Sequence, residues 1–261
     1  MNAETDLTKK IGDLHQVFYI AKIEQNNYRT WTYTFDHGMP CTPGQFVMMW
    51  LPGHGEKPFS IAWDDPLQLT IASIGPFTDA IQRLKVGDPL WVRGPIGKGY
   101  RLSGKHIVMA GRGYGAAPLL FLANRALASG IEVDVCLGAR LAKRLLLVDE
   151  FKQLGVRVHI STYDGSAGEQ GMVTMHIERI LQDPNTRPDG GVYACGPVKT
   201  LVWIDELCEK YGVPRQLSWE AHMRCGMGVC GSCEIALPNS EGDLNRSAWL
   251  VCMDGPVSFS K

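Results

Sequence analysis

The first hundred residues alternate short hydrophobic stretches, rich in β-branched and aromatic residues, with polar turn residues. The predicted strands are Val17–Ile23, Tyr28–Phe35, Gln45–Leu51 and Leu67–Ile74. Glycine, proline, asparagine and aspartate separate them, as at Asn26-Asn27 and Pro52-Gly53. Short strands at this spacing favour a small antiparallel barrel. One helix, Asp79–Lys85, is predicted before the Gly87-Asp88 turn.

Beyond Gly104 the pattern changes to hydrophobic strands that alternate with helical stretches. The predicted strands are His106–Ala110, Ile131–Leu137, Arg157–Thr162 and Val192–Cys195, and the predicted helices are Ala116–Ala128, Leu147–Leu154, Met172–Leu181 and Val198–Tyr211. This alternation predicts a parallel sheet with helical crossovers. From Val213 onward the chain reads as irregular and cysteine-bearing. We therefore expect a β barrel plus α/β fold, with a barrel domain over 1–103, a parallel-sheet domain over 104–212 and a small lobe over 213–261.

Composition narrows the class of protein. Of 261 residues, 45% are hydrophobic and 20% charged, as in ordinary soluble globular proteins. A formal net charge of −1 gives no electrostatic reason to expect nucleic acid or membrane binding. No stretch reaches the roughly 18 apolar residues of a membrane helix, and the initial MNAETDLTKKIGDLHQ has no signal-peptide pattern. We expect a cytoplasmic protein with no nucleic acid or membrane partner.

Four cysteines near the C-terminus carry the most specific chemistry. Cys225, Cys230, Cys233 and Cys252 follow the spacing C-x4-C-x2-C and then a single cysteine, which is the local pattern of a plant-type [2Fe–2S] loop. Glycines between them permit backbone with positive φ, so that N–H groups can point toward a cluster. The alternatives are a zinc site, which usually has two close cysteine pairs, and a disulfide, which needs an oxidising compartment. A [2Fe–2S] centre passes single electrons, so this chain is predicted to move electrons.

Two motifs lie where predicted strands end. The turn Gly111–Pro118 follows a strand and opens a helix, and its glycines let the backbone approach a pyrophosphate. Cys195-Gly196-Pro197 ends a later strand, at the edge where parallel sheets bind ligands. Any tight connection between a strand and a helix can use glycine, but the placement of the first motif favours a nucleotide site. The second motif, judged alone, can also be an ordinary strand-to-helix turn.

Two further motifs belong to the predicted barrel. Lys57-Pro58-Phe59-Ser60 places a cation and a hydroxyl at the start of a strand, which suits an anionic cofactor, although a solvated lysine is the commoner explanation. The segment Gly94–Tyr100, with the sequence GPIGKGY, ends the barrel and reads equally well as a plain turn.

Together the motifs KPFS, GPIGKG, GRGYGAAP, YACGP and C-x4-C-x2-C…C, in this order, resemble the ferredoxin–NADP reductase superfamily with a C-terminal cluster. The chain most resembles the electron-transfer subunit of type B dihydroorotate dehydrogenase, over nearly its whole length. The resemblance implies FAD on the barrel, NAD on the α/β domain, and a separate FMN-containing catalytic subunit that oxidises dihydroorotate, in a complex with two copies of each.

The resemblance also implies roles for individual residues. Ser60 is expected beside the flavin ring and Lys57, with Pro58 and Phe59, along its phosphate or ribityl chain. Thr78 and the turn with Gly94, Pro95 and Gly97 are expected to hold FAD. Gly111, Gly113 and Gly115 are expected to face the NAD pyrophosphate. Cys195, followed by Gly196 and Pro197, is expected near the nicotinamide and flavin N5, where it positions hydride transfer and is not a nucleophile.

Three features depart from the family pattern. Lys57 stands where arginine is usual, and lysine lacks the bidentate fork for phosphate. Pro76-Phe77 stands before Thr78, where the family has a turn richer in glycine. The gap between Cys233 and Cys252 is longer than in the family, and a surface hairpin tolerates such an insertion.

The resemblance implies an electron path from dihydroorotate through FMN, the cluster and FAD to NAD. Trp219, Met223, Met227 and Trp249 are expected either to face the partner or to pack over the cluster. One alternative function is the small subunit of a ferredoxin-dependent NADP reductase or sulfide dehydrogenase, in which Arg140, Lys143 and Arg144 could accommodate the 2′-phosphate of NADP. Isolated basic residues on a helix are more often solvated, so NAD is favoured over NADP. Another is a non-catalytic zinc or cluster protein for assembly or redox sensing.

Overall fold

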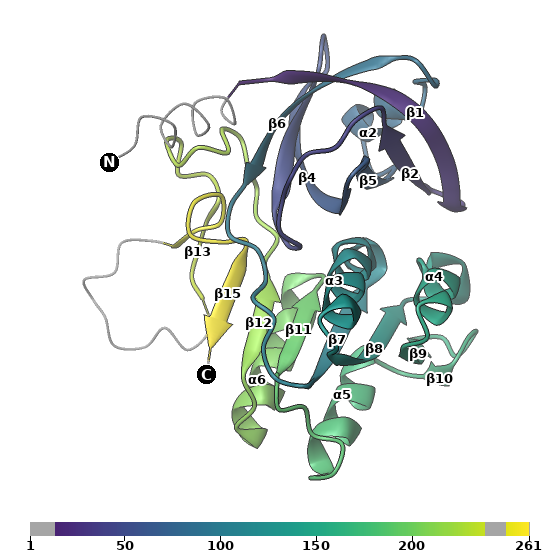
Figure 1. Ribbon diagram of the computed structural model, residues 1–261, viewed down its shortest axis with the longest axis vertical. Helices are drawn as coiled ribbons and strands as arrows, with labels where there is room; N and C mark the ends of the chain where they lie inside the picture. Colours follow the sequence, from purple (N-terminus) through teal and green to yellow (C-terminus); the bar gives the residue numbers. More distant parts are fainter. Residues whose placement is uncertain (1–13, 238–248, 261) are drawn as a thin grey trace.

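The computed structural model describes residues 14–237 and 249–260. Figure 1 shows a barrel above a sheet flanked by helices, with the C-terminal part of the chain along one side of both. Within the described residues, the helices are too short or too polar to cross a bilayer.

Six antiparallel strands close the barrel in the order β1-β2-β5-β4-β3-β6. They are β1 (Gln16–Asn27), β2 (Thr30–Phe35), β3 (Phe46–Leu51), β4 (Gly55–Asp64), β5 (Leu67–Ala72) and β6 (Pro89–Ile96). Because side chains alternate along a strand, one face fills the barrel interior, where Phe18, Tyr33, Leu69 and Leu90 are almost completely buried. The predicted barrel is confirmed, and β4 and β6 complete it.

The helix in the barrel domain begins earlier than its sequence indicated. Helix α2 (Pro76–Ile81) starts three residues before the predicted Asp79 and ends before Lys85. Proline suits the first turn because no N–H is needed there. The Thr78 hydroxyl accepts hydrogen bonds from the backbone N–H groups of Ile74 and Gly75, at 2.9 and 3.1 Å, which fixes the start of the helix.

A seven-stranded sheet forms the second body, in the order β10-β9-β8-β7-β11-β12-β15. Its strands are β7 (His106–Arg112), β8 (Glu132–Ala139), β9 (Arg157–Thr162), β10 (Glu169–Gln170), β11 (Val192–Cys195), β12 (Arg215–Ser218) and β15 (Val257–Ser260). All neighbouring pairs are parallel except β12 with β15. Strand β7, the first of the sheet in sequence, lies between β8 and β11. Its carboxyl end is therefore the switch point where such sheets bind ligands.

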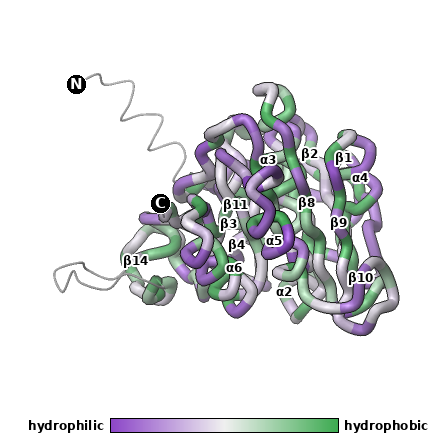
Figure 2. The backbone as a smooth tube through the Cα atoms, turned by 90° about the horizontal axis from the view of Figure 1, so that it is seen from below, coloured by the Kyte–Doolittle hydropathy of each residue, from purple (hydrophilic) through white to green (hydrophobic). Residues whose placement is uncertain are grey.

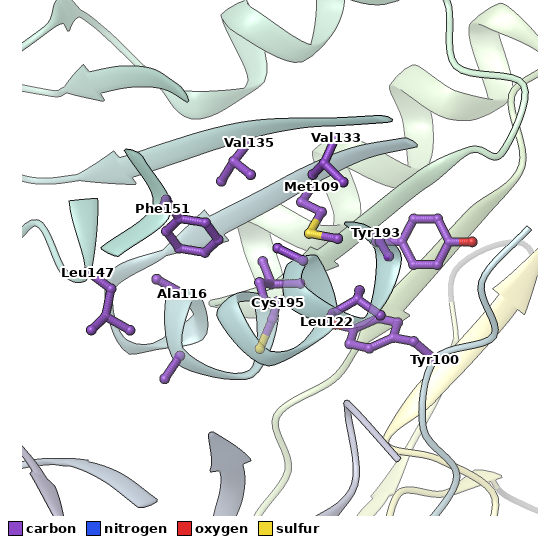
Figure 3. Close-up of a cluster of buried hydrophobic side chains, with 14 of the residues drawn as sticks. Tyr100, Met109, Ala116, Leu122, Val133, Val135, Leu147, Phe151, Tyr193 and Cys195 are labelled. Atoms are coloured by element: carbon purple, nitrogen blue, oxygen red, sulfur yellow. The ribbon is translucent and has the colours of Figure 1, made fainter. Parts of the chain in front are cut away.

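Helices cover both faces of this sheet. They are α3 (Ala116–Ala128), α4 (Val148–Gln153), α5 (Val173–Gln182) and α6 (Val198–Tyr211), with short 3-10 turns η1 (Gly113–Gly115) and η2 (Ala142–Arg144). On one face Met109, Val135 and Tyr193 pack with residues of α3 and α4 (Figure 3). Phe121 of α3 also belongs to the barrel core, so α3 joins the two bodies.

The C-terminal region is anchored in the sheet at both ends. The sequence did not indicate strand β12. The chain leaves the sheet after β12 and returns as β15, which pairs with β12. Between them a hairpin of β13 (Glu234–Ile235) and β14 (Trp249–Leu250) lies beyond this edge of the sheet. Figure 2 shows β14 at one end of the molecule and β10 at the other.

Candidate functional site

A cavity of about 580 Å³ lies between the barrel and the parallel sheet. One wall comes from β4, β5 and α2, and the other from the turn after β7, the end of β11 and the segment after β12. Segments distant in sequence therefore meet around one space, at the switch point of the sheet. A pocket of this size with a mainly apolar wall suits a flavin ring.

Part of the predicted FAD motif lines this cavity. Pro58, Phe59 and Ser60 of β4 contribute to the wall, and β4 pairs with β3 so that Ser60 lies opposite Phe46. Thr78 of α2 lies on the same wall. Lys57 is exposed on β4 and does not line the cavity. Its contact with FAD stays a prediction.

The GPIG turn instead contacts the C-terminal region. A Cβ atom on Gly97 would lie 2.4 Å from the Gly255 carbonyl oxygen, so glycine is required for this approach. The backbone N–H of Lys98 donates to that same carbonyl, and the Gln45 amide donates to the Gly97 carbonyl at 2.8 Å. Gly94 and Pro95 also lie outside the cavity wall. The predicted FAD contacts of this turn stay untested.

The two predicted nucleotide motifs lie together at the switch point. Gly111 of β7 pairs with Cys195 of β11. A Cβ atom on Gly115 would lie 2.3 Å from the Cys195 carbonyl oxygen, so only glycine fits. Gly113 has φ of 59° and open space around it, and Gly196 follows Cys195 at the strand end. Gly113 keeps part of its backbone accessible where a dinucleotide is expected, whereas Gly111 and Gly115 are buried, and their contact with NAD stays a prediction.

The Cys195 thiol is held neutral in this wall. Burial raises the pKa of Cys195 to about 12, with a contribution from the nearby Glu220 carboxylate. Such a thiol is a weak nucleophile at neutral pH. This agrees with the expected positioning role beside the reacting rings.

Sequence reasoning missed several lining residues. Tyr114, Glu220, His222 and Met223 all reach the cavity. Although part of Glu220 is exposed, burial against the cavity wall raises the pKa of its carboxyl, which also interacts with the Tyr114 hydroxyl. Tyr114 belongs to the glycine motif after β7, whereas Glu220, His222 and Met223 follow β12, a strand that no local pattern indicated.

The cysteine loop has the backbone that a cluster requires. Gly226, Gly228 and Gly231 have φ of 64°, 76° and 68°, as the sequence predicted. The backbone N–H of Met227 points at the Cys225 sulfur, 3.5 Å away. Thiolates that ligate iron accept such hydrogen bonds from their loop.

The sulfur positions suit paired ligation. The Cys233 and Cys252 sulfurs lie 3.3 Å apart. Two thiolates on one tetrahedral metal, each about 2.3 Å from it, lie roughly 3.8 Å apart. Within 14–237 and 249–260 no three histidine, cysteine or acidic side chains converge to hold a single ion, and all eight cysteines are free thiols. The separation of 3.3 Å is far longer than a disulfide bond of about 2.05 Å, so this pair fits two thiolates on one metal better than a disulfide.

Comparison with known proteins gives a consistent result. Residues 220–260 match the family described as the iron–sulfur cluster binding domain of dihydroorotate dehydrogenase B. The probable dihydroorotate dehydrogenase B (NAD(+)) electron transfer subunit of Methanothermobacter thermautotrophicus is 36% identical, over 94% of this chain and 89% of the relative. The corresponding subunit of Thermococcus kodakarensis is 39% identical, over 86% and 88%. The chain belongs to this family.

A solved structure extends the comparison to three dimensions. A chain from an NADH-dependent reduced ferredoxin–NADP oxidoreductase, studied for flavin-based electron bifurcation, superposes with a TM-score of 0.81 and 25% identity. The match covers 94% of this chain and 88% of that one. The predicted fold class is confirmed, and the protein is an oxidoreductase subunit of the dihydroorotate dehydrogenase B electron transfer family.

Two of the cysteines predicted to hold the cluster pack in the same small core as residues of the cavity wall. Phe46 and Met223 line the cavity and also pack in a small core that contains Cys233 and Cys252. Met48 belongs to the same core, and a Cβ atom on Gly226 would lie 2.8 Å from its Cγ. The cysteine loop therefore rests directly on β3 of the barrel.

The four residues expected near the partner divide into two groups. Trp219 and Met223 are 4% and 7% exposed and pack in the interior, and Trp249 is half-buried against the same core. Met223 therefore packs in the core that contains Cys233 and Cys252, whereas Trp219 packs in the core of the α/β domain. Whether Trp249 faces a partner stays a prediction. Met227 is 49% exposed and remains available to a partner.

Proposed function

We propose that the chain is the electron-transfer subunit of an NAD-linked dihydroorotate dehydrogenase. It passes electrons from FMN in a separate catalytic subunit, through a [2Fe–2S] cluster and FAD, to NAD. The observation that carries the proposal is the shared wall of Phe46 and Met223, with the cavity on one side and the cluster cysteines on the other. The family's names supply the substrate and the acceptor.

The residues of this chain bind and orient, while the cofactors supply the redox chemistry when bound. Phe59, Ser60 and Thr78 form the wall assigned to the flavin ring. Gly113 and Gly115 offer backbone to the dinucleotide, and the neutral Cys195 side chain fixes where its nicotinamide can lie. The surrounding apolar wall excludes water from the space between the two rings.

The partner surface is assigned to the tip of the cysteine loop. Cys230 is the exposed cluster ligand, whereas Cys233 and Cys252 are buried. Around it Met227, Val229 and Met253 are 49%, 80% and 51% exposed. An exposed apolar tip of this kind marks an interaction site. We place the FMN subunit there, in a cytoplasmic complex of two copies of each chain.

The test is dihydroorotate-dependent reduction of NAD by the native complex purified through this chain. The expected result is activity, a co-purifying FMN protein, and the combined absorption of flavin and cluster. In a matched complex with Cys230→Ser, we expect loss of the cluster and of dihydroorotate-driven turnover, while NADH still reduces FAD. Full partner-dependent turnover in that variant would refute the route through the cluster. A colourless protein with stoichiometric zinc would refute electron transfer altogether.

A second candidate rests on the structural match over 94% of the chain. The alternative is the small subunit of a ferredoxin-dependent NADP reductase or a sulfide dehydrogenase, which uses the same fold with another donor. A well-formed complex that carries FAD and cluster, accepts electrons from reduced ferredoxin or sulfide and is inert to dihydroorotate would select it.

A further inference from the structure

One outer face of the barrel carries large apolar side chains that are exposed. Val17 and Tyr19 of β1 and Trp50 of β3 are 39%, 48% and 37% exposed, and Trp91 of β6 is half-buried beside them. Val17 pairs with Trp91, and Trp91 pairs with Trp50, so these side chains form a row across three neighbouring strands. Tyr19 lies two residues further along β1 on the same side. We call Val17, Tyr19, Trp50 and Trp91 the aromatic face.

The aromatic face is not part of the barrel core. Side chains alternate along a strand, and the intervening residues Phe18, Met49 and Leu90 fill the interior at 0% exposed. The rings of Trp50 and Trp91 meet edge to face, 5.4 Å between centroids, which orders them as one surface. Single exposed apolar residues are ordinary, whereas a contiguous group marks an interaction site.

The cysteine loop covers the adjoining part of the same surface. Met48 and Arg93 pair one step further along β3 and β6, two residues from the tryptophans and therefore about 7 Å away. The Arg93 guanidinium donates to the Cys225 carbonyl, and Gly226 lies against Met48. Figure 1 shows the C-terminal region beside β6. The aromatic face is thus continuous with the loop that carries the predicted cluster ligands.

Polar side chains lie where the aromatic face and the loop meet. The ring of His15 lies 5.7 Å from the ring of Trp50, and its Nε2 lies 2.9 Å from Oε1 of Glu56. Glu56 also accepts two hydrogen bonds from Arg93. Protein interfaces commonly combine an aromatic centre with a partly exposed polar rim. The surface has this composition.

The tip of the cysteine loop alone is too small to hold a stable complex. A specific interface uses about 800 Å² and roughly 20–30 residues of each partner, and the exposed apolar part of the tip consists of Met227, Val229 and Met253. Aromatic side chains carry roughly 150–250 Å² each, so the exposed fractions of Tyr19 and Trp50 add on the order of 200 Å². Tyrosine and tryptophan also dominate the binding energy of many interfaces.

We propose that the aromatic face docks the FMN-containing catalytic subunit, which therefore binds the barrel as well as the cysteine loop. This inference rests on the proposed function. A cluster that receives electrons from FMN must lie where the two subunits meet, and a footprint of about 800 Å² has a radius of roughly 16 Å. A partner centred on the loop thus reaches the next step of β3 and β6. Contact with both parts holds the cluster at a fixed place relative to FMN.

The test is the dissociation of the native holo-complex on dilution, followed by analytical ultracentrifugation. We expect Trp50→Gln and Tyr19→Gln each to raise the Kd between the subunits tenfold or more, because aromatic side chains at the centre of an interface supply much of its affinity. The matched control is Tyr28→Gln, which replaces a tyrosine that is 47% exposed beyond the other end of β1. FAD content, cluster absorption and Tm report folding.

A second measurement needs no substitution. Hydroxyl-radical labelling, read by mass spectrometry, compares the free holoprotein with the complex. We expect Tyr19 and Trp50 to be labelled in the free protein and protected at least fivefold in the complex, while labelling of Tyr28 stays the same. This result does not depend on whether a variant folds.

The outcomes distinguish the partner from other occupants of the aromatic face. Kd values within twofold of the Tyr28→Gln control, with equal labelling of Tyr19 and Trp50 in free and bound protein, would overturn the proposal. A lower Tm at unchanged Kd would also overturn it and assign the face to contacts within this chain. Loss of self-association in place of partner binding would assign it to a second copy. Failure of the proposed function appears differently, as a complex that Trp50→Gln weakens but that is inert to dihydroorotate.

Discussion

Replacing Arg93 with methionine should detach the cysteine loop from the barrel. Arg93 lies on β6, is 4% exposed, and donates from Nε and Nη2 to the two carboxylate oxygens of Glu56 at 2.7 and 3.0 Å. The same Nη2 donates to the carbonyl oxygen of Cys225 at 2.5 Å. One buried cation therefore connects a barrel strand to a predicted cluster ligand.

The cost follows from these contacts. Removing one partner of a buried ion pair costs about 3–5 kcal/mol. Here Glu56 is 21% exposed and keeps a 2.9 Å hydrogen bond from His15, so about 2 kcal/mol is appropriate. The lost charge-assisted bond to Cys225 adds about 1.5 kcal/mol. Together, about 3.5 kcal/mol corresponds to a fall in Tm of roughly 7–14 °C for a chain of this size.

The assay combines stability with a reading of the cluster itself. Thermal unfolding of the anaerobic holoprotein gives Tm, and the EPR spectrum of the reduced protein reports the cluster environment. We expect a lower Tm, faster loss of cluster absorption and altered g-values in Arg93→Met. The control is Arg83→Met, which replaces an exposed arginine of the barrel domain and should leave all three quantities unchanged. Adding Glu56→Gln should recover part of the lost stability, because the unpaired carboxylate is then gone. An Arg93→Met protein with the Tm and EPR spectrum of the parent would refute the anchoring role.

The pH dependence has a definite sign. Burial alone would raise the pKa of Glu56, but hydrogen bonds from Arg93 and then His15 lower it below its ordinary value. A carboxyl with a depressed folded-state pKa contributes stability above its unfolded-state pKa, about 4.3, and loses that contribution as pH falls through the folded-state value. The stability difference between the parent and Arg93→Met should therefore be constant near pH 7 and shrink below about pH 4.

Three further substitutions test other parts of the structure. Gly115→Ala forces a methyl group against the Cys195 carbonyl oxygen, 2.3 Å away, so stability should fall by about 2 kcal/mol or more and NADH should reduce FAD more slowly, as stopped-flow absorbance measures. Lys57→Arg restores a bidentate phosphate ligand and should lower the Kd for FAD by roughly tenfold, measured by flavin fluorescence on reconstitution; unchanged affinity would argue against a phosphate contact there. Asp134→Asn removes the buried negative charge and one of the two acceptor oxygens shared by His106, Arg157 and His159, and should cost about 3 kcal/mol at pH 7 in urea unfolding. Although Asp134 is buried, these groups hold its pKa well below the usual range, so this loss should persist down to pH 5 and vanish only in strong acid.

The local sequence pattern predicted most of the alternating strands and helices of the α/β domain correctly. The ranges of α3, β9, β11 and α6 match the predicted ones, because hydrophobic periodicity and terminal glycine or proline residues are local signals. The motif Lys57–Ser60 indicated only the start of β4, and β6 was not indicated, since proline and glycine interrupt both strands, as at Pro58 and Gly94. Strand β15 pairs with β12 about forty residues earlier, and such non-local pairing leaves no local pattern.

The residues of the candidate site likewise fall into those that a local motif predicted and those that only the tertiary structure reveals. Motif residues such as Ser60, Gly115 and Cys195 could be predicted, and the structure brings all three to one cavity. Tyr114 lies within the glycine motif after β7, but Glu220 carries no motif of its own and reaches the cavity only because β12 joins the sheet. A residue whose place depends on tertiary pairing could not be found from sequence spacing alone.

The attachment of the cysteine loop bears on how electrons can pass. Beyond its two ends in the sheet, at β12 and β15, the C-terminal region contacts the barrel through Arg93 with Cys225 and through Gly97 with Gly255. It is therefore fixed to both bodies that form the cavity proposed for the flavin. Because electron transfer depends on a constant separation between centres, this double attachment explains why a loop with so little regular structure can hold a redox group. Loosening either attachment should change the rate between centres before it changes the content of either cofactor.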